Sequence, residues 1–292
     1  MHIQNTINCK GNLLDLSKPV VMGVLNATPD SFFDGGKWQE EKAYLNQAEK
    51  MLKNGATILD IGGMSSRPGA NIISEIEELN RVLPVVKLIA RQFPETIISI
   101  DTWRSKVALE TVNAGAHIVN DISGGALDET LWETVAKLKV PYILMHMQGT
   151  PKNMQENPSY DDVLTTITDF FIQKLSKLNE LGIRDVILDP GFGFGKTLTQ
   201  NYRILANLKA FQLLGLPILA GLSRKSMICK GLSVKPKHAL NGTTAANMLA
   251  LIQGARILRV HDVKEAVETI KIWKLYQNEL LHTTFIPKFA SE

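Results

Sequence analysis

Short apolar runs alternate with longer amphipathic stretches along the whole chain. Eight of the runs are almost continuously apolar, which is typical of parallel strands that are buried on both faces. These predicted strands are residues 19–26, 57–63, 96–101, 116–121, 140–146, 185–189, 217–221 and 255–261. The stretches between them have apolar positions at helical spacing. These predicted helices are residues 39–53, 74–92, 104–114, 128–138, 160–181, 198–208, 236–253 and 263–281.

Strand and helix alternate eight times in 292 residues, and no linker rich in Pro, Gly or Ser interrupts the series. This order predicts an α/β protein with a single (β/α)8 TIM barrel over residues 19–282. An open doubly wound sheet is the alternative arrangement of the same elements. Residues 1–18 precede the first unit, and we expect them to form a short N-terminal hairpin around Lys10 and Gly11. Residues 283–292 are left as a C-terminal tail.

Composition excludes several classes of protein without indicating a function. Hydrophobic residues make up 45% and charged residues 21%, which is not the composition of a disordered chain. The net charge of +3 is too small to indicate a nucleic-acid partner. Cys9 and Cys229 are the only cysteines, and such sparse use is typical of a reducing compartment. Since the chain has no apolar run of 18 residues and starts with polar residues, we expect a cytoplasmic protein with no membrane partner.

Polar side chains end nearly every predicted strand, which is where barrel enzymes carry their chemistry. These strand-end positions are Asn26, Asp60, Asp101, Asn120, Met145, His146, Asp189, Lys225, Arg259 and His261. Because side chains alternate between the two faces of a strand, Ser99 shares a face with Asp101, and Arg259 shares one with His261. Unpaired burial of so many polar groups would be unfavourable, so their convergence predicts a ligand pocket.

The chemistry of these residues predicts a ligand with two ends. Asp101, Asn120 and Asp189 form an acceptor-rich group, and a carboxylate can accept two parallel N–H bonds from a flat 2-amino-4-oxo-pyrimidine ring. Lys225, Arg259 and His261 come from the last two strands, after which barrels commonly bind phosphate. We therefore expect a polar heterocycle that carries a phosphate or diphosphate.

Two local patterns could suggest other chemistry. The loop GFGFGKT at 191–197 looks like a nucleotide-binding loop, but Pro190 stands where a P-loop needs glycine. We interpret it as a glycine-rich bend after the sixth strand that lets the Phe194 ring pack on a flat group. His146 has no carboxylate at metal-ligand spacing, so the sequence does not indicate a metal site there.

Six motifs, taken in order, strongly resemble those of dihydropteroate synthase. They are VVMGVLNATPDSFFDGG at 20–36, DIGGMSSRPG at 60–69, LMHMQ at 144–148, LDPGFGFGK at 188–196, GLSRKS at 221–226 and RVHDV at 259–263. The resemblance covers the chain from about residue 12 to residue 275. It implies a (β/α)8 transferase of folate biosynthesis, usually a homodimer, that joins 6-hydroxymethyl-7,8-dihydropterin diphosphate to para-aminobenzoate and releases diphosphate. The implied partners are these small-molecule substrates, with sulfonamides as expected ligands because they mimic para-aminobenzoate.

The resemblance also implies roles for individual residues. The pterin ring would contact Asp101, Asn120, Met145, Asp189 and Lys225. The diphosphate would contact Asn26, Ser66, Arg67, Arg259 and His261. The para-aminobenzoate pocket would consist of Phe32, Pro68, Phe194, Lys225 and Ser226. The cofactor would be Mg²⁺ on the diphosphate, reached by Asn26.

The implied catalytic residues are Asp101, Lys225, Arg259 and His261. Diphosphate leaves readily once Mg²⁺, arginine and histidine neutralise it, and Asp101 would stabilise the pterin methyl cation that remains. The aniline nitrogen is a weak nucleophile, so this SN1-like path needs no covalent enzyme intermediate. Ser226 would meet the carboxylate of para-aminobenzoate at the start of the following helix.

The second motif departs from the family pattern, which usually reads GGESTRPG. Ser66 keeps the hydroxyl of the usual threonine, but Met64 replaces a glutamate that we expect to order this loop. A non-catalytic pterin-binding paralogue is therefore one alternative function. A pterin-dependent methyltransferase domain is another, although it would not need the cationic group formed by Lys225, Arg259 and His261.

Overall fold

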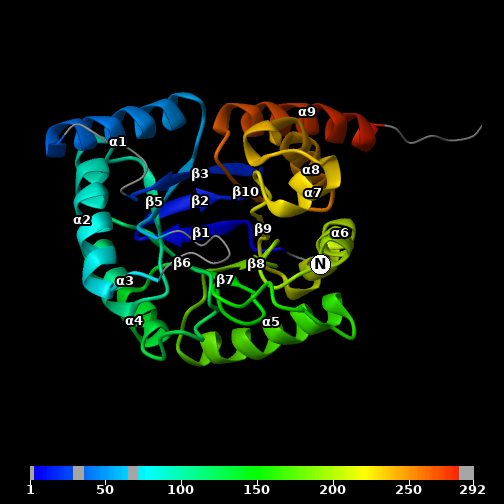
Figure 1. Cartoon of the computed structure of the whole chain (residues 1–292), viewed down its shortest axis with the longest axis horizontal. Helices are drawn as coiled ribbons and strands as arrows, with labels where there is room; N and C mark the ends of the chain where they lie inside the picture. The colour runs from blue at the N-terminus through cyan, green and yellow to red at the C-terminus, as the bar shows by residue number, and fades with distance from the viewer. Residues whose placement is uncertain (1–2, 29–35, 65–71, 283–292) are drawn as a thin grey trace, which may run out of the picture.

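The structure is a computed structural model that describes residues 3–28, 36–64 and 72–282 (Figure 1). Within these residues, parallel strands form one eight-stranded sheet in the order β8-β7-β6-β5-β4-β3-β10-β9. The strands are β3 (Val20–Asn26), β4 (Ile58–Gly62), β5 (Ile97–Asp101), β6 (Ile118–Asp121), β7 (Tyr142–Met145), β8 (Val186–Asp189), β9 (Leu219–Ala220) and β10 (Ile257–Val260). A bridge between Leu188 and Ile218 joins the two ends of this order and closes the barrel.

Helices surround this barrel, as Figure 1 shows. They are α1 (Gly36–Lys53), α2 (Glu75–Gln92), α3 (Ser105–Asn113), α4 (Leu131–Leu138), α5 (Val163–Glu180), α6 (Leu198–Ala206), α7 (Ser226–Leu232), α8 (Leu240–Ile252) and α9 (Val263–His282), with 3-10 helices η2 (Leu208–Leu214) and η3 (Pro236–His238). The predicted barrel fold is confirmed. No helix in the described part of the chain is both long and apolar enough to cross a membrane.

One predicted helix is divided in the structure, and two helices, η2 and α7, were not predicted as separate elements. The stretch 236–253 divides into η3, which begins at Pro236, and α8, which begins at Leu240. Proline fits the first turn of either kind of helix, so apolar spacing alone does not locate this break. Helix α7 has only seven residues and lies inside the connection between β9 and α8, where it is too short to show a clear apolar period.

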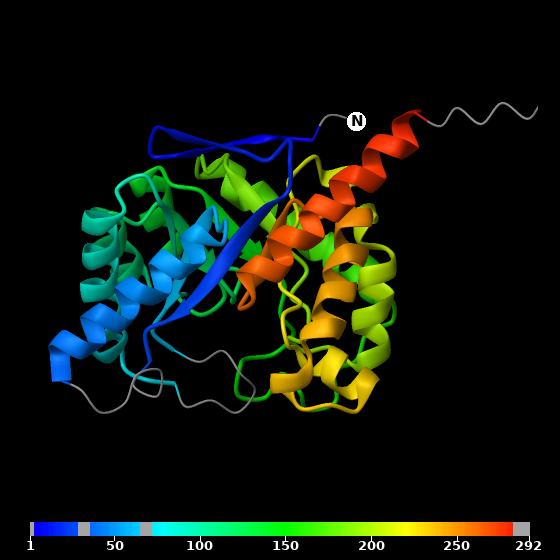
Figure 2. The same ribbon diagram turned by 90° about the horizontal axis from the view of Figure 1, so that it is seen from above.

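The expected N-terminal hairpin forms from β1 (Thr6–Cys9) and β2 (Asn12–Asp15), which pair antiparallel. Figure 2 shows it across one end of the barrel. Its buried side chains join one apolar residue from each barrel strand in a single cluster: Ile7, Cys9, Leu14, Leu16, Met22, Ile58, Ile97, Ile118, Ile143, Ile187, Leu219 and Ile257. The hairpin therefore closes the amino-terminal end of the barrel with apolar packing, which leaves the other end for polar chemistry.

Candidate functional site

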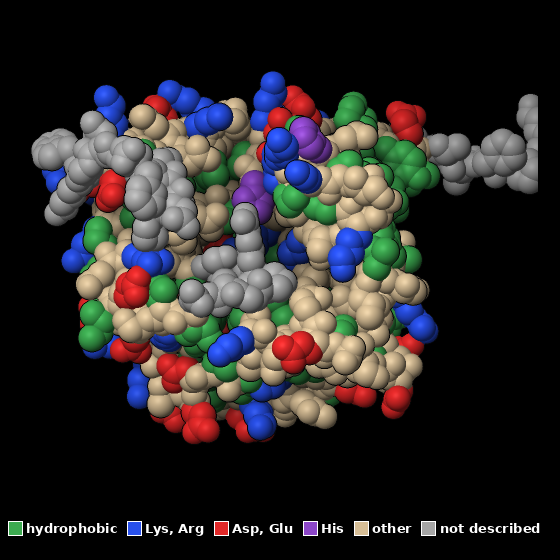
Figure 3. Space-filling view, viewed as in Figure 1, with side chains coloured by type: hydrophobic (Ala, Val, Ile, Leu, Met, Phe, Trp, Pro, Cys, Tyr) green, Lys and Arg blue, Asp and Glu red, His purple; other side chains and the backbone are tan. Residues whose placement is uncertain are grey.

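The polar residues of the barrel interior follow the apolar layer along each strand and lie closer to the carboxyl ends of the strands. The register pairs Asp60 on β4 with Ser99 on β5, and Asp101 on β5 with Asn120 on β6. Alternation along β10 places Arg259 two residues after the buried Ile257. Figure 3 faces this mouth, where lysine, arginine and histidine side chains gather beside the central hollow.

An ion cluster centred on Arg259 occupies this part of the interior. Arg259 Nε donates to Asp60 Oδ2 at 2.7 Å, and one terminal nitrogen lies 2.6 Å from the same oxygen and 2.7 Å from Asp101 Oδ2. Asn120 Nδ2 donates to Asp60 Oδ2 at 3.1 Å. Asp60 is fully buried, so these bonds offset the cost of removing its charge from water.

This cluster corrects the expectation that cations and carboxylates occupy separate ends of the pocket. Arg259 lies on β10, which is two strands from β4 and three strands from β5 in the closed sheet. Its long side chain extends through the barrel interior and bonds to both aspartates. Asp60 is among the strand-end residues that predicted the pocket, but the sequence assigned it no role in binding or catalysis. It lies between Ile58 and Gly62 on the inward face of β4, where strand alternation places it.

The pKa values of Asp101 and Arg259 are both raised, but by different causes. Desolvation raises the pKa of Asp101 to about 7, although Arg259 opposes this shift. The pKa of Arg259 is raised because Asp60 and Asp101 outweigh its own desolvation. The guanidinium is therefore a fixed positive charge, whereas the Asp101 carboxylate is close to its titration point in the protein without ligand.

A second pair, Asp189 and Lys225, lies on the opposite wall of the mouth. Asp189 Oδ1 accepts a bond of 2.7 Å from Gly191 N, and burial raises the pKa of this carboxyl while Lys225 lowers it. Burial lowers the pKa of Lys225 to about 8. Lys225 Nζ donates to Phe192 O and lies 4.6 Å from the ring centroid of Phe194. Lys225 also interacts electrostatically with Arg259 and Asp101, so the charged residues of the mouth lie near one another.

An apolar wall borders these polar groups. Its buried members are Trp103, Ile122, Met145, Met154 and Phe194, and Met64 and Met147 pack against them half-buried. Methionine sulfur and aromatic rings form a polarizable surface that suits a flat ring system. Met64, expected only to remove a carboxylate, contributes to this wall. The loop that it was expected to affect lies outside the described residues.

The remaining predicted residues are at the rim or outside the described chain. Asn26 is exposed at the end of β3, and Ser226 is exposed at the first position of α7. His261 Nδ1 lies 3.0 Å from Ser223 Oγ, and His261 N also donates to that oxygen at 3.2 Å. Phe32, Ser66, Arg67 and Pro68 lie outside the described residues.

The described residues offer little of their own to a metal ion. They contain no group of three or more His, Cys, Asp or Glu side chains arranged to hold one. Asn26 supplies one amide oxygen at the mouth. Mg²⁺ in proteins is commonly held by one or two side chains together with substrate phosphates and water. This donor set fits a magnesium ion that arrives with a phosphorylated substrate and does not fit a resident metal cage.

Comparisons with known proteins agree with this geometry. Residues 22–261 match the family described as pterin binding enzyme. Dihydropteroate synthase of Escherichia coli K12 is 49% identical over 265 residues, which cover 90% of this chain and 93% of that protein. The structure of Yersinia pestis dihydropteroate synthase with a sulfonamide drug has a TM-score of 0.88 and 46% identity, covering 94% of this chain and 99% of the other. Xanthomonas albilineans dihydropteroate synthase with 4-aminobenzoic acid has a TM-score of 0.87 and 38% identity, covering 94% and 98%.

Proposed function

The chain belongs to the dihydropteroate synthases, within the family of pterin binding enzymes, and from this premise we propose how its residues divide the reaction between them. Enzymes of this kind join 6-hydroxymethyl-7,8-dihydropterin diphosphate to para-aminobenzoate in folate biosynthesis. The products are 7,8-dihydropteroate and diphosphate. The assignment of roles rests on the bonds and electrostatic interactions that bring Asp101, Asn120, Asp189 and Lys225 together at the barrel mouth, near an apolar wall, and we infer that they border the space for the pterin.

The pterin ring binds in this space, with its polar edge toward Asp101, Asn120, Asp189 and Lys225. A carboxylate can accept two parallel N–H bonds from the amino-pyrimidine edge. Asn120 donates its amide to Asp60, which leaves its carbonyl oxygen as an acceptor for the ring. Met145 packs on the face of the ring and supplies apolar contact without competing for its hydrogen bonds.

The diphosphate lies toward the last strand, where Arg259 and His261 supply positive charge and hydrogen bonds. Ser66 and Arg67 are further proposed contacts. A Mg²⁺ ion bound to the diphosphate would be held by Asn26, and it would supply further neutralisation of the leaving group. Arg259 keeps its charge throughout the reaction because its ion pair with Asp60 raises the pKa of the guanidinium.

The reaction then proceeds by an SN1-like path. The bond between the pterin methylene carbon and the diphosphate oxygen breaks, and both electrons leave with the oxygen. Asp101 stabilises the cation that remains on the pterin and its methylene group. The lone pair of the para-aminobenzoate nitrogen forms the new C–N bond, and this nitrogen then loses a proton to solvent. No group of the protein becomes covalently attached at any step.

Para-aminobenzoate binds between Phe194, Lys225 and Ser226, with Phe32 and Pro68 as further proposed contacts. The ring would pack against Phe194, which already lies beside the Lys225 ammonium, and the carboxylate would meet the Ser226 hydroxyl. Two structural relatives support binding of this class of ligand, since one was solved with 4-aminobenzoic acid and one with a sulfonamide drug. Sulfonamides are accordingly proposed as inhibitors of this chain.

The chain is also proposed to form a homodimer through α9. Ile272, Leu275, Tyr276 and Leu280 are all exposed apolar side chains on this helix, and their spacing of three and four residues places them on one side. Figure 2 shows the last turns of α9 projecting past the barrel. A second copy would remove this surface from water. Leu275→Glu should yield a monomer by light scattering, whereas Lys271→Glu beside it should remain dimeric.

The cytoplasm is the proposed location. Both cysteines are free thiols, with Cys9 buried and Cys229 half-buried, and free thiols are usual in a reducing compartment. Oxidation of the purified chain with a mild disulfide-forming reagent should leave its activity unchanged. Activity that required a disulfide would contradict this location.

A direct assay tests the proposed function. The purified chain is mixed with the pterin diphosphate, para-aminobenzoate and Mg²⁺, and dihydropteroate is measured by chromatography. We expect product that depends on all three additions and that a sulfonamide suppresses. Pterin binding without product would indicate a non-catalytic pterin-binding protein.

A further inference from the structure

The loop between β8 and α6 is held in an unusual way. Its five successive carbonyl oxygens, from residue 191 to residue 195, each accept a hydrogen bond from a side chain. The donors, in chain order of the acceptors, are Lys196, Lys225, Gln155, Lys196 again and Tyr160. Regular secondary structure would satisfy these carbonyls with backbone N–H groups. The conformation of this loop therefore depends on its own Lys196 and on side chains from two other connections, β7–α5 and β9–α7.

Lys196 contributes more of these bonds than any other donor. Its ammonium donates to Gly191 O and Phe194 O at 2.9 Å each, and to His146 O at 3.2 Å. An ammonium has three N–H groups, so these carbonyls use all of them. The residue is only 3% exposed, and burial lowers the pKa of its amine well below the usual value. A lysine buried at this cost has a specific task, because an apolar side chain could fill the same volume.

The loop connects the groups that we propose to bind the two substrates. Its first residue, Gly191, donates to the Asp189 carboxylate, and Phe192 O accepts from Lys225. Phe194 places its ring 4.6 Å from the Lys225 ammonium. A shift of the loop would consequently move Phe194 and release Lys225, while Asp189 remains anchored on its strand.

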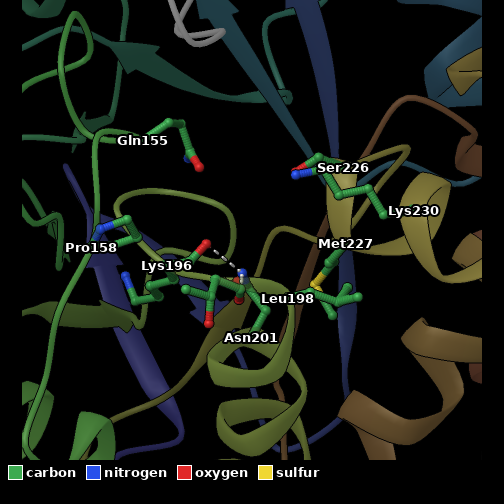
Figure 4. A pocket seen from close by; sticks show the side chains of 9 residues that line it. Gln155, Pro158, Lys196, Leu198, Asn201, Ser226, Met227 and Lys230 are labelled. Carbon is green, nitrogen blue, oxygen red and sulfur yellow. Dashed lines mark hydrogen bonds between the residues drawn. The ribbon is translucent and has the colours of Figure 1, made fainter.

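Packing alone does not fix the loop, because a cavity of about 200 Å³ lies beside it. Figure 4 shows Gln155 and Ser226 on opposite sides of this cavity, with Lys196 and Asn201 at its base. Asn201 Oδ1 accepts from Gly193 N at 2.7 Å, and its amide donates to Lys196 O at 3.1 Å. Polar contacts thus take the place of packed side chains on this side of the loop.

We propose that Lys196 is a positioning residue for the para-aminobenzoate subsite: it fixes residues 191–195 so that Phe194 and Lys225 face the aromatic amine. Lys196 contacts neither substrate in this account, and the inference rests on the proposed function. Its loss should therefore affect the aromatic substrate and its analogues first. The pterin should be affected less, because Asp101, Asn120 and Met145 do not belong to this loop.

The test is a KM comparison for Lys196→Met, which keeps the length of the side chain and removes its donors. We expect the KM for para-aminobenzoate and the inhibition constant of a sulfonamide to rise together by about tenfold, as expected for lost charge-assisted bonds. The KM for the pterin diphosphate should stay within about threefold. Lys230→Met is the matched control, since this exposed lysine borders the same cavity and should leave both KM values unchanged.

Two further variants keep the test decisive if Lys196→Met does not fold. Lys196→Gln retains an uncharged donor, and Tyr160→Phe removes only the bond of 2.7 Å to Gly195 O. Both should raise the KM for para-aminobenzoate selectively, by less than Lys196→Met. Equal rises in the two KM values, or a lower kcat with both KM values unchanged, would overturn the proposal. A wild-type chain that forms no dihydropteroate would instead overturn the proposed function.

Discussion

Replacement of Asp60 by asparagine tests the buried ion cluster, because the two side chains have nearly the same shape. Asp60 Oδ2 receives two bonds from Arg259 and one from Asn120. Hydrogen bonds to charged groups contribute about 1.5–3 kcal/mol each. Asparagine still offers an oxygen to Arg259, and Arg259 keeps Asp101 as a counter-ion. We therefore expect a loss of about 2–4 kcal/mol in the free energy of unfolding, near the lower limit for a broken buried pair.

This loss converts into a measurable fall in the unfolding temperature. The entropy of unfolding is roughly 2.1 cal/mol/K per residue, so for 292 residues it is about 0.6 kcal/mol/K. Asp60→Asn should thus lower the Tm by about 3–7 °C in calorimetry. It should also lower kcat by about tenfold, because Asp101, whose charge the reaction needs, is then the one carboxylate of the described residues left in an ion pair with Arg259.

Ser99→Ala is the matched control for this substitution. Ser99 lies opposite Asp60 in the strand register, and its buried hydroxyl has no hydrogen-bond partner among the described residues. Removing this hydroxyl should leave the Tm equal or slightly higher and the activity unchanged. An Asp60→Asn variant as stable and as active as the wild type, or an equally damaging Ser99→Ala, would refute the structural role of the ion cluster.

Three smaller predictions concern titration and packing. Catalysis needs ionised Asp101 and protonated Lys225, whose pKa values are about 7 and about 8. The value of kcat/KM should therefore rise as the pH increases through 7 and fall above pH 8. A flat profile between pH 6 and 9 would contradict these roles. Cys9 is buried, and its pKa is raised to about 12; a thiol reagent should therefore titrate only Cys229 in the native protein and both thiols after unfolding. Met64→Glu, which restores the usual family residue, should lower the Tm relative to Met64→Leu because it places a carboxylate against the apolar wall.

The barrel could be predicted from the sequence because its signal is local and repeated. Residues 58–62 form β4 inside the predicted range 57–63, and α2 begins at Glu75 directly after its capping Ser74, the first residue of the predicted helix. Burial on both faces makes such strands apolar throughout. The break before Leu240 could not be predicted, because a 3-10 turn and the first turn of an α-helix accept the same residues.

Strand-end position identified Asp60, Asp101 and Arg259 as candidate site residues, but not which of them pair. Strand alternation identifies the inward face of each strand, and Asp101 and Arg259 both lie on inward faces as expected. Which carboxylate a long arginine reaches depends on barrel closure and on rotamers, which no linear pattern contains. The role of Lys196 could not be predicted either. The sequence excluded a P-loop, but the three carbonyl groups that accept from Lys196 come together only in the folded loop.

We propose that Asp101 acts mainly by stabilising the pterin cation and only secondarily by binding the pterin ring. A carboxylate about 5 Å from the developing charge contributes about 3 kcal/mol at an effective dielectric constant of about 20, which corresponds to roughly a hundredfold in rate. The most direct measurement is single-turnover kinetics of Asp101→Asn together with the Kd for the pterin diphosphate. We predict that the chemical step slows by about a hundredfold while the Kd changes by less than tenfold. Equal losses in rate and affinity would contradict the claim.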